Sequence, residues 1–165
     1  PPRSTLFPYT TLFRSKGFYG IMANFNGERL GMAAGAAASA RVCVEEAASW
    51  ARERKTFGKR LADHQVIRHK LASMAQRVWA TTTMLDTYAW HVQNGNTPVA
   101  ELAMLKVQAT ETLEFCAREA MQILGGAGFI RGHRVERIYR EVRVMAIGGG
   151  SEEIMRDLAA RQLAV

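Results

Sequence analysis

The sequence lacks an apolar run long enough to cross a membrane, and it lacks a secretory signal. Charged residues or Gln interrupt every apolar stretch well before the roughly 18 residues that a span needs. The first residues also lack the order of a signal peptide, which is a charged segment, an apolar run and a small-residue cleavage site. We therefore expect neither a membrane span nor a leader.

Cysteine is scarce. The two cysteines, Cys43 and Cys116, lie far apart, with no C-x-x-C motif and no His pair beside them. This spacing excludes the usual redox motif and the usual zinc site, so we expect no metal. Cysteine without such partners is commonly a buried thiol, which favours a reducing compartment. We expect the protein to be cytoplasmic and bacterial.

Acidic residues are too few to balance the basic ones, and the formal net charge is +7. A charge of this sign raises the hypothesis of a nucleic-acid partner. Basic residues cluster between positions 52 and 60 and recur every three residues from Arg131 to Arg143, but Glu136 and Glu141 interrupt the second series. Interspersed acids are typical of a solvated helix face. We expect no nucleic acid, because an anionic small ligand such as a nucleotide cofactor fits this charge better.

The first fifteen residues do not share the pattern of the rest. They are rich in Thr, Phe and Pro, show no helical period and begin without Met. We interpret residues 1–15 as a non-native segment that resembles a translated sequencing-adapter read-through; a linker from a preceding β-rich domain is the alternative. Without Arg3 and Arg14 the formal charge falls from +7 to +5, which weakens the case for a polyanionic partner.

Proline is absent between Ile21 and Arg54, where alanine is abundant and apolar residues recur at helical spacing. This pattern predicts one long helix, which Gly31 and Gly35 could loosen. The same period predicts further helices along the chain. The predicted helices span 21–54, 65–92, 98–124, 135–144 and a last segment from residue 151, separated by breaks at 57–64, 94–98 and 125–129.

Two helix starts carry capping signals. Thr97 precedes Pro98, which predicts Thr97 as the N-cap and Pro98 as the first helical residue. The last helix follows A-I-G-G-G-S-E-E-I-M, in which Ser151 is a good N-cap and the next two acids suit the positive end of the helix dipole. The three glycines let a backbone approach a phosphate or a carbonyl closely; a flexible turn into a surface helix is the alternative.

No segment of the sequence alternates as a strand, and the connections between the predicted helices are short. With 48% hydrophobic residues the chain can bury one core. We therefore predict an all-α fold, an antiparallel domain that resembles a four-helix bundle.

Three segments contain sequence motifs that helix formation alone does not explain. They are R-E-R-K-T-F-G-K-R-L-A-D-H-Q (52–65), Q-I-L-G-G-A-G-F (122–129) and R-I-Y-R-E-V-R-V-M-A-I-G-G-G-S-E-E-I-M-R (137–156). Their order and spacing resemble the acyl-CoA dehydrogenases, and the resemblance covers residues 16–165. It matches only the C-terminal helical domain of that family, without the N-terminal helical domain and the middle β-domain. The resemblance thus implies a fragment that is inactive by itself.

The family reaction is α,β-desaturation of an acyl-CoA thioester to the trans-2-enoyl-CoA. A carboxylate removes the α-proton while a hydride leaves the β-carbon for FAD, and hydrogen-bond donors hold the thioester oxygen as it gains charge. The loop position that usually carries the catalytic glutamate aligns with Gly149. In the isovaleryl-CoA and long-chain branches a glutamate in an E-R-L segment replaces it, and Glu28 occupies that position. The resemblance implies Glu28 as the base and the Gly149 N–H as the donor; a helix residue favoured by the dipole is the alternative for Glu28.

The resemblance also implies binding residues. Asn26 and Arg29 match positions near the CoA moiety, and Gly149 lies beside the thioester. Positions that match FAD contacts, some of them to the FAD of a neighbouring subunit, are Arg54, Phe57, Gln65, Gln122, Gly125, Gly126, Ser151 and Glu153.

The resemblance further implies FAD as the cofactor, an acyl-CoA substrate and an electron-transfer flavoprotein as the electron acceptor. It implies a homotetramer that shares FAD between subunits, with a role in fatty acid β-oxidation. Two alternatives are a flavin-dependent monooxygenase or oxidase of the same fold and a non-catalytic helical interaction domain. Acyl chain length and branching depend partly on domains outside this sequence.

Overall fold

The computed structural model describes residues 17–164, and the interpretation of residues 1–15 lies outside this range. The predicted all-α fold is confirmed. The elements are α2 (Gly17–Glu53), β1 (Lys55–Thr56), β2 (Lys59–Arg60), the 3-10 helix η1 (Leu61–Asp63), α3 (Gln65–Gln93), α4 (Val99–Leu124), α5 (Gly126–Phe129), α6 (Arg134–Ile147) and α7 (Glu152–Leu163).

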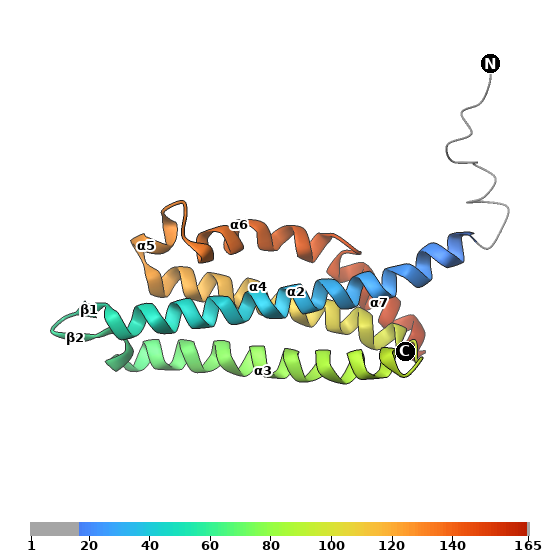
Figure 1. Ribbon diagram of the computed structural model, residues 1–165, viewed down its shortest axis with the longest axis horizontal. Coiled ribbons are helices and arrows are strands. Elements are labelled where there is room, and N and C mark those ends of the chain that lie inside the picture. The colour runs from blue at the N-terminus through green and yellow to red at the C-terminus, as the bar shows by residue number, and fades with distance from the viewer. Residues whose placement is uncertain (1–16, 165) are drawn as a thin grey trace, which may run out of the picture.

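The long helices form an antiparallel bundle (Figure 1). α2 runs to the β1–β2 hairpin, α3 returns, α4 runs back toward the hairpin end and α6 returns again. α7 lies at the end of the bundle opposite the hairpin. The glycine loop between α6 and α7 therefore lies at the same end as the first turns of α2.

α4 is the central helix of the bundle, because it packs against α2, α3, α6 and α7. Its side chains Leu102, Leu105, Leu113 and Cys116 are at most 1% exposed. Burial of apolar surface at roughly 25 cal/mol per Å² is the main force that holds such a core. α4 thus supports α6 and α7, and with them the glycine loop that joins these two helices.

Small side chains bring α2 close to α4. Five alanines recur every three, four or seven residues along one face of α2 with zero exposure: Ala33, Ala36, Ala40, Ala47 and Ala51. α2 is one continuous helix from residue 17 to residue 53, so the expected loosening at Gly31 and Gly35 does not occur.

The predicted start of the third long helix is one residue early. Pro98 has φ −76° and ψ 78°, and its carbonyl accepts the first helical hydrogen bond, from the Leu102 N–H at 2.9 Å. Pro98 is therefore the N-cap, and no side chain caps this helix. The predictions of Thr97 as N-cap and Pro98 as first helical residue are wrong.

Two short elements lie in the predicted breaks. Residues 55–60 form an antiparallel hairpin in which Lys55 pairs with Arg60 and Thr56 with Lys59. Residues 126–129 form one helical turn, α5. Neither has enough residues to show a hydrophobic period, so the sequence pattern gave no signal for them.

Candidate functional site

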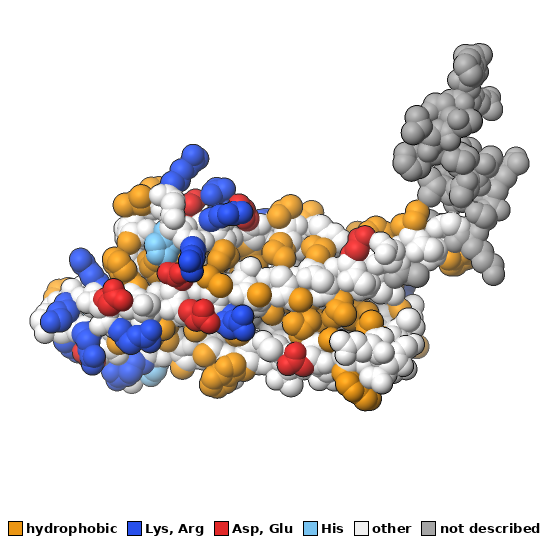
Figure 2. Space-filling view, in the orientation of Figure 1, with side chains coloured by type: hydrophobic (Ala, Val, Ile, Leu, Met, Phe, Trp, Pro, Cys, Tyr) orange, Lys and Arg blue, Asp and Glu red, His pale blue; other side chains and the backbone are white. Residues whose placement is uncertain are grey.

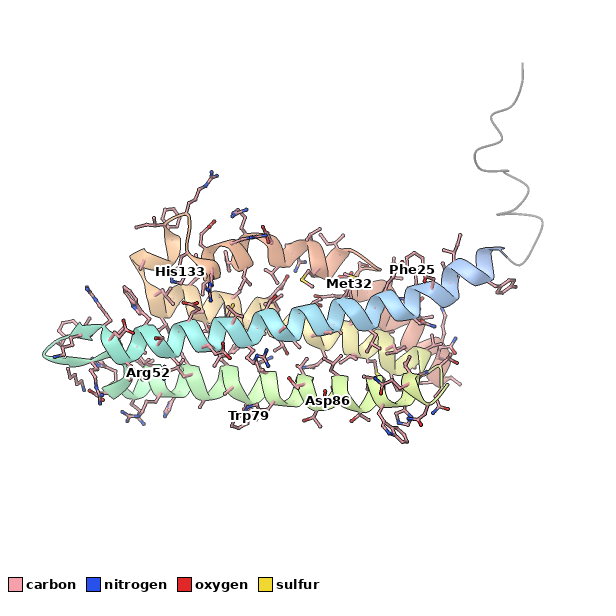
Figure 3. All side chains as sticks on the ribbon, in the orientation of Figure 1. Phe25, Met32, Arg52, Trp79, Asp86 and His133 are labelled. Atoms are coloured by element: carbon pink, nitrogen blue, oxygen red, sulfur yellow. The ribbon has the colours of Figure 1, made fainter. Side chains whose placement is uncertain are left out.

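The glycine run forms the loop between α6 and α7. The Gly148 N–H donates to the Val144 carbonyl at 2.8 Å and ends α6. Gly149 and Gly150 have φ +69° and +117°, where residues with a side chain are strained. A Cβ on Gly149 would lie 2.7 Å from Sδ of Met32, which α2 presents toward this end of the bundle (Figure 3). The loop conformation therefore favours glycine at both positions. Met32 occupies the space that a side chain at position 149 would need.

Ser151 begins the last helix as predicted. Its Oγ accepts a hydrogen bond from the Ile154 N–H at 3.4 Å. Glu153 lies in the same turn, and hydrogen bonds from its own backbone N–H and from the Ser151 hydroxyl lower the pKa of its carboxyl group. The predicted cap is confirmed, and it fixes where the loop ends.

Two buried cations hold the carbonyl groups of this loop. Arg29 of α2, which is 8% exposed, donates from Nε to the Gly149 carbonyl at 3.3 Å. Lys106 of α4 has zero exposure and donates from Nζ to the carbonyls of Ala146 at 2.8 Å and Gly150 at 2.7 Å. Helices α2 and α4 thus each bind the backbone of the loop through one cationic side chain.

Lys106 was not among the predicted site residues. The sequence does contain a signal for it, because Lys106 lies four residues after Leu102 and seven before Leu113, on the stripe that forms the core. A lysine at a core position requires polar partners. Burial lowers the pKa of Lys106, and the nearby Arg29 lowers it further, whereas the Glu152 carboxylate opposes this shift.

The E-R-L segment of α2 reaches the loop through Arg29. Besides the Gly149 contact, Arg29 Nη1 donates to Asn26 Oδ1 at 3.1 Å, and its guanidinium lies 5.7 Å from the centre of the Phe25 ring. Burial lowers the pKa of Arg29, and the neighbouring Glu28 carboxylate opposes this shift. The structure therefore brings the predicted substrate-binding residues Asn26, Arg29 and Gly149 together.

Glu28 lies on the exposed surface of α2, next to Arg29 in the chain. Consecutive side chains of a helix point about 100° apart. Glu28 therefore lies beside the face of α2 from which Arg29 binds the loop. Its Oε1 accepts a hydrogen bond from Asn24 Nδ2 at 2.7 Å. The carboxylate is thereby oriented by its own helix and is accessible from outside the domain.

Part of the predicted cofactor-binding set meets at the hairpin end. Arg54, Gly125 and Gly126 line one hollow of about 410 Å³, together with Trp50. Gly125 has φ +61°, and a Cβ on Gly126 would meet no atom within 4 Å. The hollow therefore presents a cation beside backbone that carries no side chain.

Three other predicted residues do not line this hollow. Phe57, at the hairpin tip, is 96% exposed and has φ 51°, a strained conformation for an aromatic residue. Gln65 Nε2 lies 3.5 Å from His69 Nε2 on α3. Gln122 lines a separate hollow of about 320 Å³ with Tyr139.

The predicted FAD residues thus fall at two ends of the bundle. Arg54 follows α2 at the hairpin end, whereas Ser151 and Glu153 begin α7 at the other end (Figure 1). Along α2, Arg29 and Arg54 are about 37 Å apart at 1.5 Å per residue.

Basic side chains gather at the hairpin end (Figure 2). Lys55, Lys59 and Arg60 lie in the hairpin itself, and all three are exposed. On α6 the arginines are paired with acids. Arg140 Nε donates to Glu136 at 2.8 Å, and Arg137 pairs with Glu141 one turn along the helix. These pairs agree with the prediction of a solvated helix face. Arg60 pairs with Asp63 at 3.0 Å, so the net positive charge around the hairpin is smaller than its number of basic side chains suggests.

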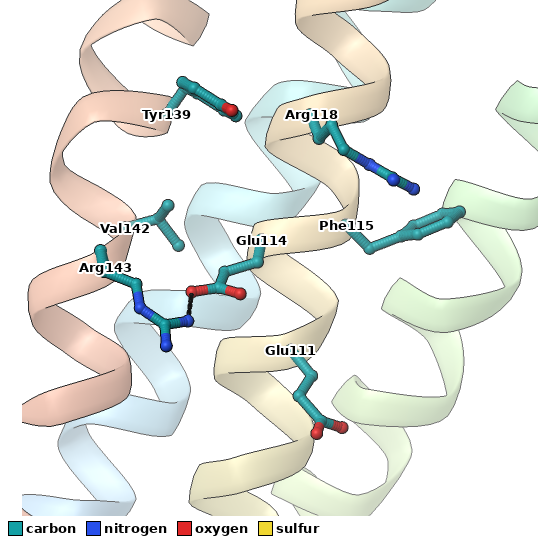
Figure 4. Close-up of a pocket in the computed structure, with 7 residues that line it drawn as sticks. All are labelled: Glu111, Glu114, Phe115, Arg118, Tyr139, Val142 and Arg143. Carbon is teal, nitrogen blue, oxygen red and sulfur yellow. Dashed lines mark hydrogen bonds and ion pairs between the residues drawn. The ribbon is translucent and has the colours of Figure 1, made fainter. Parts of the chain in front are cut away.

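A further hollow, of about 580 Å³, lies between α4 and α6 (Figure 4). Arg143 Nη1 donates to Glu114 Oε1 at 2.5 Å across it. None of the predicted site residues lines it. The lining residues are Glu111, Glu114, Phe115, Arg118, Tyr139, Val142 and Arg143.

The remaining predictions concern cysteine, metal and membrane. Cys43 and Cys116 are buried and free, as predicted, and burial raises the pKa of each thiol to about 12. Within residues 17–164, no three His, Cys, Asp or Glu side chains form a group that could hold a metal ion. No helix in the same range is both long and apolar enough to span a membrane.

Comparison with known proteins identifies similar domains. The family model described as "Acyl-CoA dehydrogenase, C-terminal domain" matches residues 15–164. A probable acyl-CoA dehydrogenase from Mycobacterium abscessus superposes with a TM-score of 0.88 at 42% identity, over 90% of this chain and 39% of that one.

Two curated relatives add detail. Acyl-CoA dehydrogenase AFT10-1 of Alternaria alternata is 38% identical over 90% of this chain and 37% of its own length. The caffeyl-CoA reductase-Etf complex subunit CarC of Acetobacterium woodii is 37% identical over 90% of this chain and 39% of its own length. The chain thus spans less than half the length of the relatives it matches.

Proposed function

Because the chain belongs to the acyl-CoA dehydrogenase family, whose C-terminal domain it matches over residues 15–164, we propose that residues 16–165 are the C-terminal helical domain of a longer FAD-dependent enzyme. That enzyme would also contain an N-terminal helical domain and a middle β-domain. The proposed reaction is α,β-desaturation of an acyl-CoA thioester to the trans-2-enoyl-CoA. By itself the chain would hold only part of each site and would be inactive.

The contact between α2 and the glycine loop carries this proposal. Arg29 of the E-R-L segment donates to the Gly149 carbonyl. This contact supports a site in which the segment with a carboxylate and the loop without one would form two walls. Met32 fills the space into which a side chain at Gly149 would extend. A base for the α-proton must then come from outside the loop, and the position of Glu28 beside Arg29 supports that role.

We assign the removal of the α-proton to Glu28. Its carboxylate is held by Asn24 at 2.7 Å and is exposed on this domain, so the other domains of the proposed enzyme would have to enclose it. As the proton moves to a Glu28 oxygen, the electron pair of the broken C–H bond forms the new double bond, and a hydride leaves the β-carbon. A bound FAD would supply the acceptor for that hydride.

The loop would hold the thioester oxygen. Negative charge grows on this oxygen as the α-proton leaves, and a fixed backbone N–H stabilises it. Gly149 can supply such an N–H without a side chain in the way. Asn26, which is hydrogen-bonded to Arg29, would contact the CoA moiety, and the buried Arg29 would act on that group through Asn26.

The residues at the hairpin end fit a dinucleotide. Arg54 can donate two parallel hydrogen bonds to a pyrophosphate, and the bare backbone of Gly125 and Gly126 allows close approach. Phe57 and Gln65 lie on the same end of the bundle and would contact the same molecule, and Gln122 would meet its adenosine end. Ser151 and Glu153 lie at the other end, so they would contact a second FAD. This arrangement supports a homotetramer in which each FAD is shared between two copies.

An electron-transfer flavoprotein would be the electron acceptor, and the similarity to the CarC subunit of a reductase-Etf complex supports this partner. The same similarity favours a second candidate reaction, the reduction of an α,β-unsaturated CoA thioester, since the groups that remove a proton can return it. We place the enzyme in the bacterial cytoplasm and in fatty acid oxidation.

Anaerobic flavin spectroscopy on the complete enzyme tests the proposal. Saturated acyl-CoAs of several chain lengths should bleach the oxidised flavin, and an electron-transfer flavoprotein should restore it. Reduced flavin that is reoxidised by an enoyl-CoA, but not by the electron-transfer flavoprotein, would favour the reductase. Oxygen consumption with a substrate that is not a thioester would contradict both and favour the monooxygenase or oxidase.

A further inference from the structure

Lys106 is a buried cation that the reaction described above does not use. It belongs to the central helix α4, has zero exposure and donates to the carbonyls of Ala146 and Gly150, which flank the glycine turn. Arg29 of α2 donates to the carbonyl of Gly149. Three carbonyls within five residues of chain are therefore bound by two cations on two different helices.

Binding the carbonyls leaves the N–H groups of the loop available. Within residues 17–164, neither the Gly149 N–H nor the Gly150 N–H donates a hydrogen bond to the protein. A glycine turn without such anchors would sample many backbone conformations. Because the anchors fix both flanks of the turn, they also fix the direction in which these two donors point.

The charges around the loop favour an electron-rich ligand. Lys106 and Arg29 contribute two positive charges behind it, and Glu152 is the acid close enough to offset the effect of burial on Lys106. The charged residues that face Lys106 from the packed elements are thus Arg29 on α2 and Glu152 on α7. Lys106 and Arg29 are buried next to the loop, so water screens their charges little. Their positive charge strengthens a hydrogen bond from a backbone N–H of the loop to an oxygen that gains negative charge.

We infer that Lys106 is a positioning residue, which holds the Gly149–Gly150 turn so that its free N–H groups form the binding site for the thioester oxygen. The inference rests on the proposed function, because it takes the thioester from there. Lys106 itself does not touch the substrate. It acts through the two carbonyls it binds and through its charge.

The first test uses the 165-residue chain with ¹⁵N-labelled glycine. In Lys106→Met the order parameters of Gly149 and Gly150 should fall from about 0.85, the value of rigid backbone, toward 0.6 or below. Lys70→Met is the matched control, because Lys70 is also a helix lysine with a single protein partner, Glu119, far from the loop. If Lys106→Met does not fold, Lys106→Gln, which keeps N–H donors without the charge, takes its place. Equal order parameters in the Lys106 and Lys70 variants would overturn the inference.

The second test uses the complete enzyme, with Glu28→Gln to prevent turnover. The infrared carbonyl band of a bound ¹³C-labelled acyl-CoA thioester reports the hydrogen bond to its oxygen. Adding Lys106→Met should return this band toward its position in free acyl-CoA while binding persists, and Lys70→Met should leave it shifted. In the enzyme with Glu28 intact, Lys106→Met should lower kcat by roughly 10- to 100-fold, as a small misplacement of catalytic groups does, with little change in KM.

The results separate the two proposals. A shifted carbonyl band that Lys106→Met leaves in place overturns the inference and spares the proposed function. A complete enzyme that binds no acyl-CoA and shows no flavin reduction refutes the proposed function and, with it, the role of Lys106 toward a thioester.

Discussion

At the scale of single residues, backbone conformation limits which side chains the loop can carry. Gly149 has φ +69° and Gly150 has φ +117°. A side chain in the left-handed region costs about 1–2 kcal/mol. The loop therefore carries no side chain at Gly149, and its backbone can turn sharply beside Met32.

This cost can be measured on the 165-residue chain by urea unfolding. Gly149→Ala should lower the free energy of unfolding by about 1–2 kcal/mol, because Ala is strained at this φ and Met32 must also move. Gly31→Ala is the matched control, since Gly31 is helical and its added Cβ meets open space. It should stabilise the chain by roughly 0.5–1 kcal/mol. A neutral Gly149→Ala would show that the loop does not hold this conformation.

Residue-level predictions succeeded where the cause is local. The cap by Ser151 depends on a hydrogen bond between residues three apart, and the sequence shows both. The contact of Arg29 with Gly149 spans 120 residues, so no local pattern encodes its geometry. The sequence allows Lys106 to be recognised as a lysine on a core stripe. It does not allow its two carbonyl partners, which lie 40 and 44 residues away, to be identified.

At the scale of elements, the alanine seam determines how closely α2 approaches α4, and so where Arg29 meets the loop. Ala40 is fully buried in this seam, whereas Ala38 on the same helix is exposed. A larger side chain in a packed interface forces its neighbours apart.

We predict that Ala40→Leu lowers the free energy of unfolding by about 1–3 kcal/mol. Ala38→Leu should change it by less than about 0.5 kcal/mol, because the added side chain remains in solvent. Urea unfolding of both variants provides the comparison. Similar values for the two would contradict close packing between α2 and α4.

The Asp63 carboxylate pairs with Arg60, the last residue of the hairpin that carries Phe57. Asp63 accepts hydrogen bonds from Arg60 Nε at 3.1 Å and Nη2 at 3.0 Å. These bonds from Arg60 lower the pKa of Asp63. Because the pKa is lower in the folded than in the unfolded state, the stabilisation is complete above the unfolded value of about 3.9 and is lost as the pH falls through the folded value.

We therefore expect the NMR signals of the hairpin amides to shift in this acidic range, before the helices unfold. Asp63→Asn should remove the transition, and Asp86→Asn, which changes an exposed acid on α3, should retain it. Hairpin signals that titrate equally in wild type and Asp63→Asn would exclude Asp63 as the cause.

The helices could be predicted because their period repeats over many residues and averages out local exceptions. The hairpin has two residues in each strand, and α5 has four residues, so neither repeats a period. The misplaced start at Thr97 arose because Pro98 fits both the N-cap and the first helical position, and its ψ of 78° decides between them.

At the scale of the whole molecule, the proposed site residues are divided between the two ends of one bundle. Arg54, Gly125 and Gly126 gather at the hairpin end, and Glu28, Arg29 and Gly149 at the other. Under the proposed function, a complete site would therefore combine the hairpin end of one copy with the loop end of another. The sequence indicated both sets of residues, but only the fold shows how far apart they lie.

Subunit mixing tests this division in the complete enzyme. Arg54→Ala should lose FAD affinity and Glu28→Gln should lose the base, so each variant alone should be inactive. When the two are co-expressed, some mixed oligomers combine an intact hairpin end with an intact loop end, and activity should partly return. No recovery in oligomers shown to be mixed would mean that each site is built within a single copy.

The most direct test of the central claim is the rate of anaerobic flavin reduction by acyl-CoA in the complete enzyme, compared between wild type, Glu28→Gln and Glu45→Gln. Glu45 is an exposed acid on the same helix and serves as the control. Glu28→Gln should bind acyl-CoA but reduce flavin at least 10²- to 10⁴-fold more slowly, the typical loss when a general base is removed. Glu45→Gln should match wild type. Flavin reduction by Glu28→Gln at the wild-type rate would contradict the account, because the α-proton would then have another acceptor.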